Sequence, residues 1–336
     1  MMRRCDFDRW RTRRERSRTT RHPPFARWAA SVLVALATSS NAVGVARAEP
    51  APGFVSVMFG RMQWTTTDHT CAALPDTIDL GTVKRALDAR RIPATGIVIT
   101  SWTAKDRFRC LAGTKVPGWK RIEAWHADGW SFVSGGTHAD MTKLTYAERW
   151  EESCGSLRAF ARRGIDASGM FAYGNNRYTD RIQGDPVSRC FAFGRRYSGS
   201  LNHRSTAAPL WYAHVHSVNG GKCNDPKRRC YTKPYQSPRR YSSPSAMARR
   251  IRVAENTWYP LQFYRFVRGS YAGARHAWNC RSDDWRRHFT SHSELYCYRD
   301  FVRVMDALER ATKRGVVATD PGSVADAWGR STSTRT

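Results

Sequence analysis

The sequence has no apolar run long enough to cross a membrane as a helix, which takes about 20 residues. It contains no Cys-x-x-Cys pair, so a structural zinc site of the usual spacing is not indicated. Acidic residues are scarce, with 28 Asp and Glu against 56 Lys and Arg. We recognise no internal repeat and no nucleic-acid-binding module. These absences argue against a membrane-spanning helix, a zinc ribbon, a repeat array and a nucleic-acid partner.

Residues 1–48 are predicted to be a secretory signal peptide. An arginine-rich start through Arg27 precedes an apolar run from Trp28 to Ala37, and Ala46-Arg47-Ala48 fits a small-x-small cleavage site. No twin-arginine consensus adjoins the apolar run, so the export route stays open. We expect a secreted protein, extracellular or associated with the cell wall, in which 49–53 is a linker and 54–330 forms one domain.

The positive charge persists without this leader, because the leader holds only 11 of the 56 basic and 3 of the 28 acidic residues. The remainder carries a net charge of about +20, a field that favours anionic partners such as wall polymers or acidic polysaccharide. An arginine-rich surface that simply faces water explains the same composition, and the sequence does not decide between the two.

The cysteines that follow the leader are even in number, which suits disulfide pairing in an exported protein. Two short separations suggest local bridges, Cys223–Cys230 and Cys280–Cys297. The other four are expected to pair among themselves; they are Cys71, Cys110, Cys154 and Cys190.

Strand and helix patterns alternate along most of the chain, which predicts a parallel sheet with helices outside. Strands are expected to end near Phe59, Thr100, Ser134, Gly174 and Gly194, with later strands in 258–267 and 315–319. Helices are expected over 79–91, 117–127, from Thr145 onward and over 294–313, and 324–329 has the pattern of a docking tail. Prolines and glycines indicate a loop-rich insertion near residues 195–256. The fold class is therefore α/β, a distorted (β/α) barrel of about seven parallel strands.

The stretch from Gly129 to Leu144 carries the clearest functional signal. An apolar strand breaks at Ser134-Gly135-Gly136-Thr137-His138, and a helix begins after Thr145, whose capping box is completed by Glu148. His138 therefore follows the carboxyl end of a strand, where barrels of this kind place their ligand sites.

This stretch resembles the second motif of polysaccharide deacetylases, Ser-His-Thr-x-x-His-Pro-x-Leu, with His138 at the second histidine and Ser134 or Gly135 at the first. The resemblance implies a deacetylase-like barrel, a divalent metal and a metal-bound hydroxide that attacks an acetyl carbonyl. The family's first motif, Thr-Phe-Asp-Asp, corresponds to Met58-Phe59-Gly60-Arg61, so both aspartates are missing. Its third motif keeps only Tyr173 and Gly174.

The resemblance thus leaves one metal ligand at most, His138, and the family's divalent metal is not expected to be retained. Substitute ligands would have to come from elsewhere; the candidates are Asp68, His69, Asp140, His214 and His216. The simpler interpretations also stand: His214-Val215-His216 as polar surface of a loop, and His138 with Asp140 as a cap of the following helix. Three tryptophans in predicted loops, Trp64, Trp102 and Trp211, are candidates for stacking on sugar rings, although burial would explain them equally well.

Two functions survive. In the first, the protein removes an acyl group from extracellular or cell-wall polysaccharide, with His138 as ligand or general acid and Tyr173 as a positioning or polarising group. In the second, it binds a glycan, acetylated or anionic, without catalysis. Substrate contacts are predicted from strand ends and neighbouring loops: Gly60, Arg61, Ser134, Gly135, Gly174, Trp64, Trp102 and Trp211.

Overall fold

A computed structural model describes most of the chain beyond residue 50. The described residues are 51–60, 76–103, 117–137, 139–197, 201–204, 212–217, 242–253, 255–272, 277–284, 288 and 295–329. The chain divides into two units, 1–48 and 49–336, and every described residue belongs to the second. Within this part of the chain, no helix has the length and apolar character that a membrane crossing requires.

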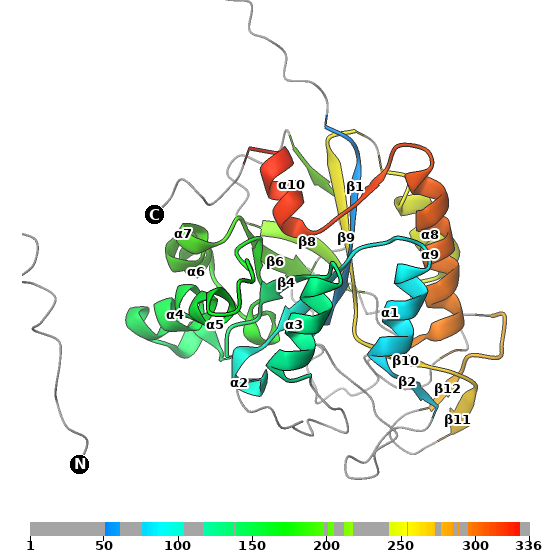
Figure 1. Cartoon of the computed structure of the whole chain (residues 1–336), viewed down its shortest axis with the longest axis horizontal. Helices are drawn as coiled ribbons and strands as arrows, with labels where there is room; N and C mark the ends of the chain where they lie inside the picture. Colours follow the sequence, from blue (N-terminus) through cyan, green and yellow to red (C-terminus); the bar gives the residue numbers. More distant parts are fainter. Residues whose placement is uncertain are drawn as a thin grey trace, which may run out of the picture. The chain divides into compact units, whose positions relative to one another are not determined.

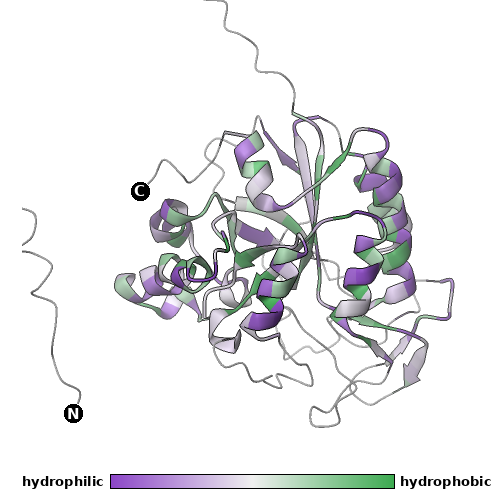
Figure 2. Ribbon diagram, in the orientation of Figure 1, coloured by the Kyte–Doolittle hydropathy of each residue, from purple (hydrophilic) through white to green (hydrophobic). Residues whose placement is uncertain are grey.

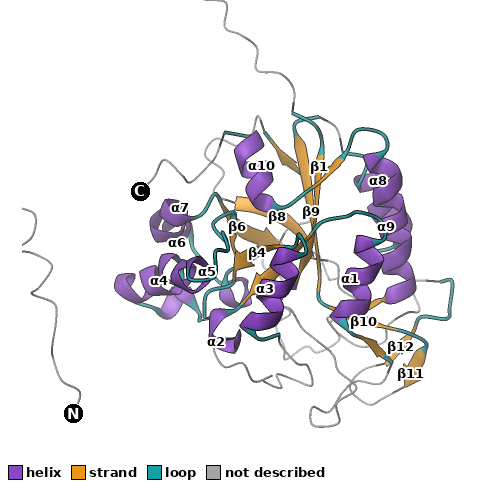
Figure 3. Cartoon of the chain, in the orientation of Figure 1, coloured by secondary structure: helices purple, strands orange, loops and turns teal. Residues whose placement is uncertain are grey.

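Seven parallel strands form the centre of the molecule (Figures 1 and 3). Their hydrogen-bonded order is β1-β3-β4-β5-β6-β8-β9, and β9 also pairs with β1 along its whole length, so the curled sheet closes on itself. The predicted parallel barrel is therefore confirmed. The strands are β1 Phe54–Phe59, β3 Ala94–Val98, β4 Ser131–Ser134, β5 Met170–Phe171, β6 Phe193–Tyr197, β8 Tyr212–Ser217 and β9 Thr257–Phe263.

Strand β1 shows why these segments fold as barrel strands. All six of its residues are buried, since alternate side chains face the helices outside and the barrel interior. Val55, Val57 and Phe59 pack with the outer helices, whereas Phe54 and Met58 pack with inward-facing side chains of the other strands. Figure 2 shows apolar colouring on parts of the central strands and both apolar and polar colouring on the helices.

Helices cover the outside of the barrel, with α1, α8 and α9 on one side of it (Figure 1). Asp79 caps α1 by accepting the Thr82 amide. The predicted capping box of Thr145 and Glu148 is present at the start of α4. The helix bounds are α1 Leu80–Asp88, α2 Thr100–Thr103, α3 Trp119–Ala127, α4 Tyr146–Glu152, α5 Leu157–Ala161, α6 Asp180–Ile182, α7 Ser188–Cys190, α8 Pro244–Arg250, α9 Tyr298–Thr312 and α10 Pro321–Ala327.

The amino end of the barrel is filled with aromatic side chains. Trp258 of β9 donates from Nε1 to the Ser56 hydroxyl at 2.9 Å and packs against Phe193. Trp328, which follows α10, makes edge contacts with both rings, so the expected docking tail does dock here. Because this end is packed with apolar groups, a polar site has room only toward the carboxyl ends of the strands.

Short strands complete the fold at the edges of the barrel. β14 (Val317–Ala318) pairs with the start of β1, and β7 (Asn202–His203) pairs antiparallel with β9. A second sheet contains β13 (Leu295–Cys297), β10 (Arg265–Val267) and β2 (Thr77–Ile78), and β11 (Ser270–Ala272) forms a hairpin with β12 (Ala277–Asn279). The last long helix therefore starts at Tyr298 rather than at residue 294, because the residues before it extend a sheet.

The helix after the capping box differs from its predicted form. A helix was expected from Thr145 onward, but α4 ends at Glu152, where Ser153 leaves helical geometry, and α5 resumes at Leu157. Tyr146, the first residue of α4, is 50% exposed. The break turns Glu152 inward, where it is only 4% exposed.

Two disulfides lie in the described residues. Cys280–Cys297 was expected as a local bridge, and Cys154–Cys190 joins two of the four cysteines that were expected to pair among themselves. Cys71, Cys110, Cys223 and Cys230 lie outside the described residues. Much of the predicted insertion at 195–256 lies outside them too, but its described part includes barrel strand β8 and helix α8.

Candidate functional site

Gly60 directly follows β1, and other side chains fill the space beside its Cα atom. A Cβ atom built on Gly60 would lie 2.4 Å from Cε1 of Tyr264 and 2.6 Å from Nε2 of Gln262. Ordinary carbon contacts are about 3.5–4.0 Å, so no side chain fits at position 60 unless these neighbours move. Tyr264 and Gln262 thus fill the place where the resemblance puts the family's first aspartate.

The groups around Gly60 form a buried polar cluster inside the carboxyl end of the barrel. Gln262 donates from Nε2 to the Tyr197 hydroxyl at 2.8 Å, and the hydroxyls of Tyr197 and Tyr264 hydrogen-bond to each other. Arg195 of β6 donates from Nη2 to the backbone carbonyl of Tyr173 at 2.9 Å and from Nη1 to the side-chain Oε1 of Gln262 at 3.4 Å. These contacts link the ends of three strands, β5, β6 and β9.

Arg195 gives this cluster its charge. The residue is 6% exposed, and its guanidinium carbon lies 4.4 Å from the centre of the Tyr197 ring. In the part of the chain that the structure describes, no carboxylate forms an ion pair with it. A guanidinium stays protonated at all ordinary pH values, so the cluster opposes a divalent cation and favours an anion or a neutral acceptor.

Hydrogen bonds of two buried serines, Ser134 and Ser156, hold the loop after β4. The Ser134 hydroxyl lies 2.6 Å from that of Ser156 and accepts the Gly136 amide at 3.0 Å. Gly136 has a φ of +58°, and a Cβ there would lie within 2.4 Å of the Glu152 carboxylate. Ser134, a predicted substrate contact, is fully buried and braces the turn, while a Cβ on neighbouring Gly135 would lie 2.9 Å from Ile99.

Glu152 holds the same loop on both sides of position 138. Its Oε1 accepts the backbone amides of Thr137 and Ala139, each at 3.0 Å, and its Oε2 accepts the Thr137 hydroxyl. Sequence reasoning missed this residue because its neighbours in the chain made Glu152 look like part of an exposed helix face. The only sequence signal was a carboxylate two turns after the capping box.

Asp140 caps a short 3-10 helix, Met141–Lys143, whereas the helix that it was expected to cap is capped by Thr145. Its carboxylate accepts from the amide and hydroxyl of Thr142, at 3.2 and 2.6 Å, and pairs with Arg177 at 2.6 Å. Burial raises the pKa of Asp140, but these hydrogen bonds and the arginine outweigh it and hold the pKa below its ordinary value. Both carboxylate oxygens are thus engaged by neighbours.

Tyr173 and Trp102 flank this region from β5 and α2. Tyr173 is fully buried with its ring 4.8 Å from that of Tyr178, and Gly174 follows it into a 3-10 turn. Trp102 is half-buried on α2, next to Ser101, whose hydroxyl donates to the Thr137 carbonyl at 2.9 Å. Trp102 is therefore the predicted sugar-stacking residue that the structure places beside the loop after β4.

Several predicted site residues lie outside the described residues: His138, Arg61, Trp64, Asp68, His69 and Trp211. His214 and His216 lie on β8, a barrel strand rather than a loop, and nothing is described of their side chains. The strand order brings the ends that carry Gly60, Gly135 and Gly174 to one end of the barrel. That these residues line one cleft stays a prediction.

No family model matches the chain, and neither does any curated protein. The solved structures similar to it are polysaccharide deacetylases and carbohydrate esterases, the family that the motif resemblance indicated. A probable polysaccharide deacetylase from Pseudomonas aeruginosa is 12% identical, with a TM-score of 0.43 over 83% of this chain and 92% of that one. The chitin deacetylase of Colletotrichum lindemuthianum is 13% identical, with a TM-score of 0.39 over 84% and 89%. A family 4 carbohydrate esterase from Streptomyces lividans is 11% identical, with a TM-score of 0.36 over 81% and 94%. Scores this low say nothing about the activity of this chain.

Proposed function

We propose that this protein is secreted and binds extracellular or cell-wall polysaccharide at the carboxyl end of its barrel, without the metal chemistry of the deacetylases it resembles. The observation that carries the proposal is the crowding at Gly60. Tyr264 and Gln262 occupy the space that a catalytic aspartate would need. A site that had only lost its carboxylate would leave a gap there, whereas this one is filled and hydrogen-bonded.

The described residues do not fit the divalent metal that the family resemblance implies. The first motif supplies Gly60 where a carboxylate is needed, and Gly135 or Ser134 stands where the first histidine would be. The Arg195 guanidinium is buried in the same end of the barrel, where its charge opposes a cation. The proposed function therefore includes no metal-dependent step.

An aromatic face at this end would suit a glycan, because aromatic faces can stack on pyranose rings. Trp102 is the described candidate for stacking. Arg61, outside the described residues, remains a predicted contact for a carboxylate or phosphate group on an anionic polymer.

Export is the second part of the proposal. The arginine-rich leader with its small-x-small site supports it, and so do the disulfides Cys154–Cys190 and Cys280–Cys297, since such bonds persist in oxidising compartments. Detection of a chain that begins at Glu49 outside the expressing cells would test this part on its own.

A deacylase with a remodelled site is the second candidate, and Glu152 favours it. This buried carboxylate accepts three hydrogen bonds, two from the backbone amides on either side of His138 and one from the Thr137 hydroxyl. Such fixation suits a histidine that must be held for ligation or general-acid work. In this alternative, Tyr173 would position or polarise the substrate.

Binding and acetate release separate the two candidates. We expect the wild type to sediment with insoluble acetylated glycans such as chitin or peptidoglycan and to release no acetate. Trp102→Ala should weaken binding about 3- to 10-fold, the size of a lost aromatic stacking contact. Tyr271→Ala is the matched control, because Tyr271 is an exposed aromatic residue on the β11–β12 hairpin.

Three results would change the assignment. Equal binding by wild type and Trp102→Ala would reject the stacking contact. Acetate release that a chelator abolishes would reject the loss of metal chemistry and establish the second candidate. An Arg61→Ala variant that binds acidic and neutral oligosaccharides as the wild type does would reject the anion contact.

A further inference from the structure

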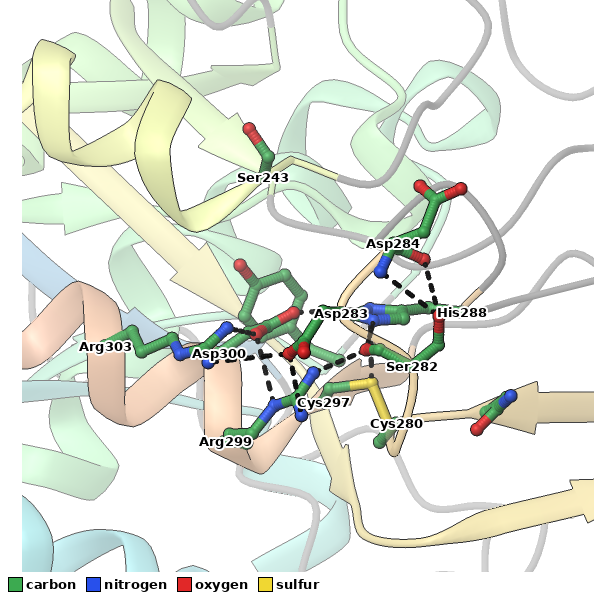
Figure 4. A network of polar contacts seen from close by, with 12 residues as sticks. Ser243, Cys280, Ser282, Asp283, Asp284, His288, Cys297, Arg299, Asp300 and Arg303 are labelled. Carbon is green, nitrogen blue, oxygen red and sulfur yellow. Dashed lines mark hydrogen bonds and ion pairs between the residues drawn. A yellow bond between two sulfur atoms is a disulfide. The ribbon is translucent and has the colours of Figure 1, made fainter.

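A buried polar cluster surrounds the Cys280–Cys297 disulfide at the start of α9, away from the residues discussed above. Figure 4 shows His288 and Asp300 beside the disulfide, with Arg299 and Arg303 on the far side of the carboxylate. His288 and Asp300 are each 1% exposed, Cys297 is fully buried and Cys280 is 5% exposed. Polar side chains this deeply buried need a structural or chemical reason.

Two distances among Cys297, His288 and Asp300 match those of a tetrahedral zinc site. The Cys297 Sγ lies 3.6 Å from the His288 Nδ1, and that nitrogen lies 3.2 Å from the Asp300 Oδ2. With Zn–S bonds of about 2.3 Å and Zn–N or Zn–O bonds of about 2.0–2.1 Å, tetrahedral geometry separates sulfur from nitrogen by about 3.6 Å and nitrogen from oxygen by about 3.3 Å. Within the described residues, these three side chains form the one group with donor atoms this close together.

The neighbours orient these donor atoms inward. The His288 Nε2 lies 2.9 Å from the Ser282 carbonyl oxygen, to which it can donate, and Nδ1 faces the sulfur and the carboxylate. Metal-binding histidines are usually held by such a bond from the other ring nitrogen. On Asp300, Oδ1 faces Arg303 at 3.5 Å and Arg299 at 3.9 Å, so Oδ2 is the oxygen turned to the histidine.

We propose that reduction of the Cys280–Cys297 disulfide creates a zinc site whose ligands are Cys280, Cys297, His288 and Asp300. In the oxidised chain the sulfurs are bonded to each other and are poor ligands. A dithiol reductant breaks the S–S bond, becomes a disulfide itself and transfers two protons and two electrons to the two sulfurs. Zn²⁺ then displaces both protons, and the sulfurs separate to about 3.8 Å as thiolate ligands.

The charges balance in the metal-bound state. Two thiolates and one carboxylate bring three negative charges against two on the metal, which leaves one. Arg299 and Arg303, with side chains 35% and 52% exposed, lie beside Asp300 and offset that charge. Without a metal, the same reduced site would hold two thiols beside the buried side chains of His288 and Asp300, so Zn²⁺ is expected to stabilise the reduced fold.

The test uses the full-length chain, reduced without air by a phosphine, which binds zinc weakly, and then titrated with Co²⁺ as a spectroscopic substitute for Zn²⁺. We expect the intense visible bands of tetrahedral cobalt and the near-ultraviolet charge-transfer band of cobalt thiolate, at roughly one metal per chain. Oxidised protein should show neither. Zn²⁺ should displace the cobalt and raise the melting temperature of the reduced protein by roughly 5 °C at a hundredfold excess over its dissociation constant.

Variants assign the signal to this cluster rather than to the other cysteines. Cys280→Ser/Cys297→Ser should lose this equivalent of cobalt, and His288→Asn should weaken binding at least about 10-fold. Cys154→Ser/Cys190→Ser is the matched control, since it removes the other described disulfide and should keep the full signal. Circular dichroism of each reduced variant shows whether it is folded.

Several outcomes would overturn the proposal. One is a reduced wild type that binds no more cobalt than the Cys280→Ser/Cys297→Ser variant. A second is equal loss in the Cys154→Ser/Cys190→Ser control. A third applies even if reduction loosens the fold: Zn²⁺ that neither restores the circular dichroism nor raises the melting temperature of the reduced wild type.

Discussion

Alanine at position 60 is the sharpest test of the crowded barrel end. Its Cβ would lie 2.4 Å from Cε1 and 2.7 Å from Cδ1 of the Tyr264 ring, more than 1 Å inside ordinary contact. The ring has little room to retreat, because Tyr264 is 8% exposed and its hydroxyl is bonded to Tyr197. Gly60 itself carries no backbone requirement for glycine, since it lies outside the left-handed region.

The expected cost follows from two terms. Overpacking a buried site costs about 1–3 kcal/mol. Turning the Tyr264 ring also breaks its hydroxyl contact with Tyr197, which adds about 0.5–1.5 kcal/mol. Gly60→Ala should therefore lower the free energy of unfolding by roughly 2–4 kcal/mol, measured by urea unfolding. Gly60→Asp meets the same crowding, so restoring an aspartate is expected to unfold the barrel end rather than to create a metal ligand.

A double-mutant cycle and a control decide whether the crowding is the cause. Tyr264→Ala removes the obstructing ring, so the double variant Gly60→Ala/Tyr264→Ala should be more stable than the sum of the single effects by about 1–3 kcal/mol. Gly184→Ala is the control, because its Cβ would meet nothing within 4 Å. Additive single effects, or a Gly60→Ala variant within about 0.5 kcal/mol of the wild type, would refute the reasoning.

Three further predictions concern carboxylates and a buried phenol. Glu152→Gln should lower the free energy of unfolding in urea by about 1–3 kcal/mol, because a neutral amide accepts the loop amides less well, whereas Glu151→Gln, in an exposed ion pair, should change it by less than about 0.5 kcal/mol. Burial raises the pKa of Asp140, but its hydrogen bonds and Arg177 have the larger effect and hold the pKa below its ordinary value. Asp140→Asn should therefore lower the free energy of unfolding at pH 7. The difference in stability between the variant and the wild type should vanish as the pH falls through the folded-state pKa of Asp140. Burial raises the pKa of Tyr259 to about 12, so wild-type stability should fall as the pH rises from about 10 toward 12, and Tyr259→Phe should lessen that fall in alkaline urea titrations.

The sequence alone determined the features that depend on neighbouring residues. Strand β1 was predicted to end near Phe59, where it does end, because a short run of residues suited to burial favours a strand covered on both faces. The capping box of Thr145 and Glu148 was also predictable, since its partners are three residues apart. Parallel order followed from the alternation of strands with helices. The absence of a carboxylate at Gly60 was likewise visible in the motif.

Only the tertiary structure decided what occupies the barrel end and what surrounds the disulfide at α9. Tyr264 and Gln262 meet Gly60 because β9 pairs with β1, a contact between opposite ends of the chain that no local pattern encodes. His214 and His216 could be interpreted either as a pair on one face of a strand or as the polar surface of a loop, and strand pairing places them on β8. Burial of charged groups such as Arg195 depends on which partners the fold brings to them, and composition carries no record of that.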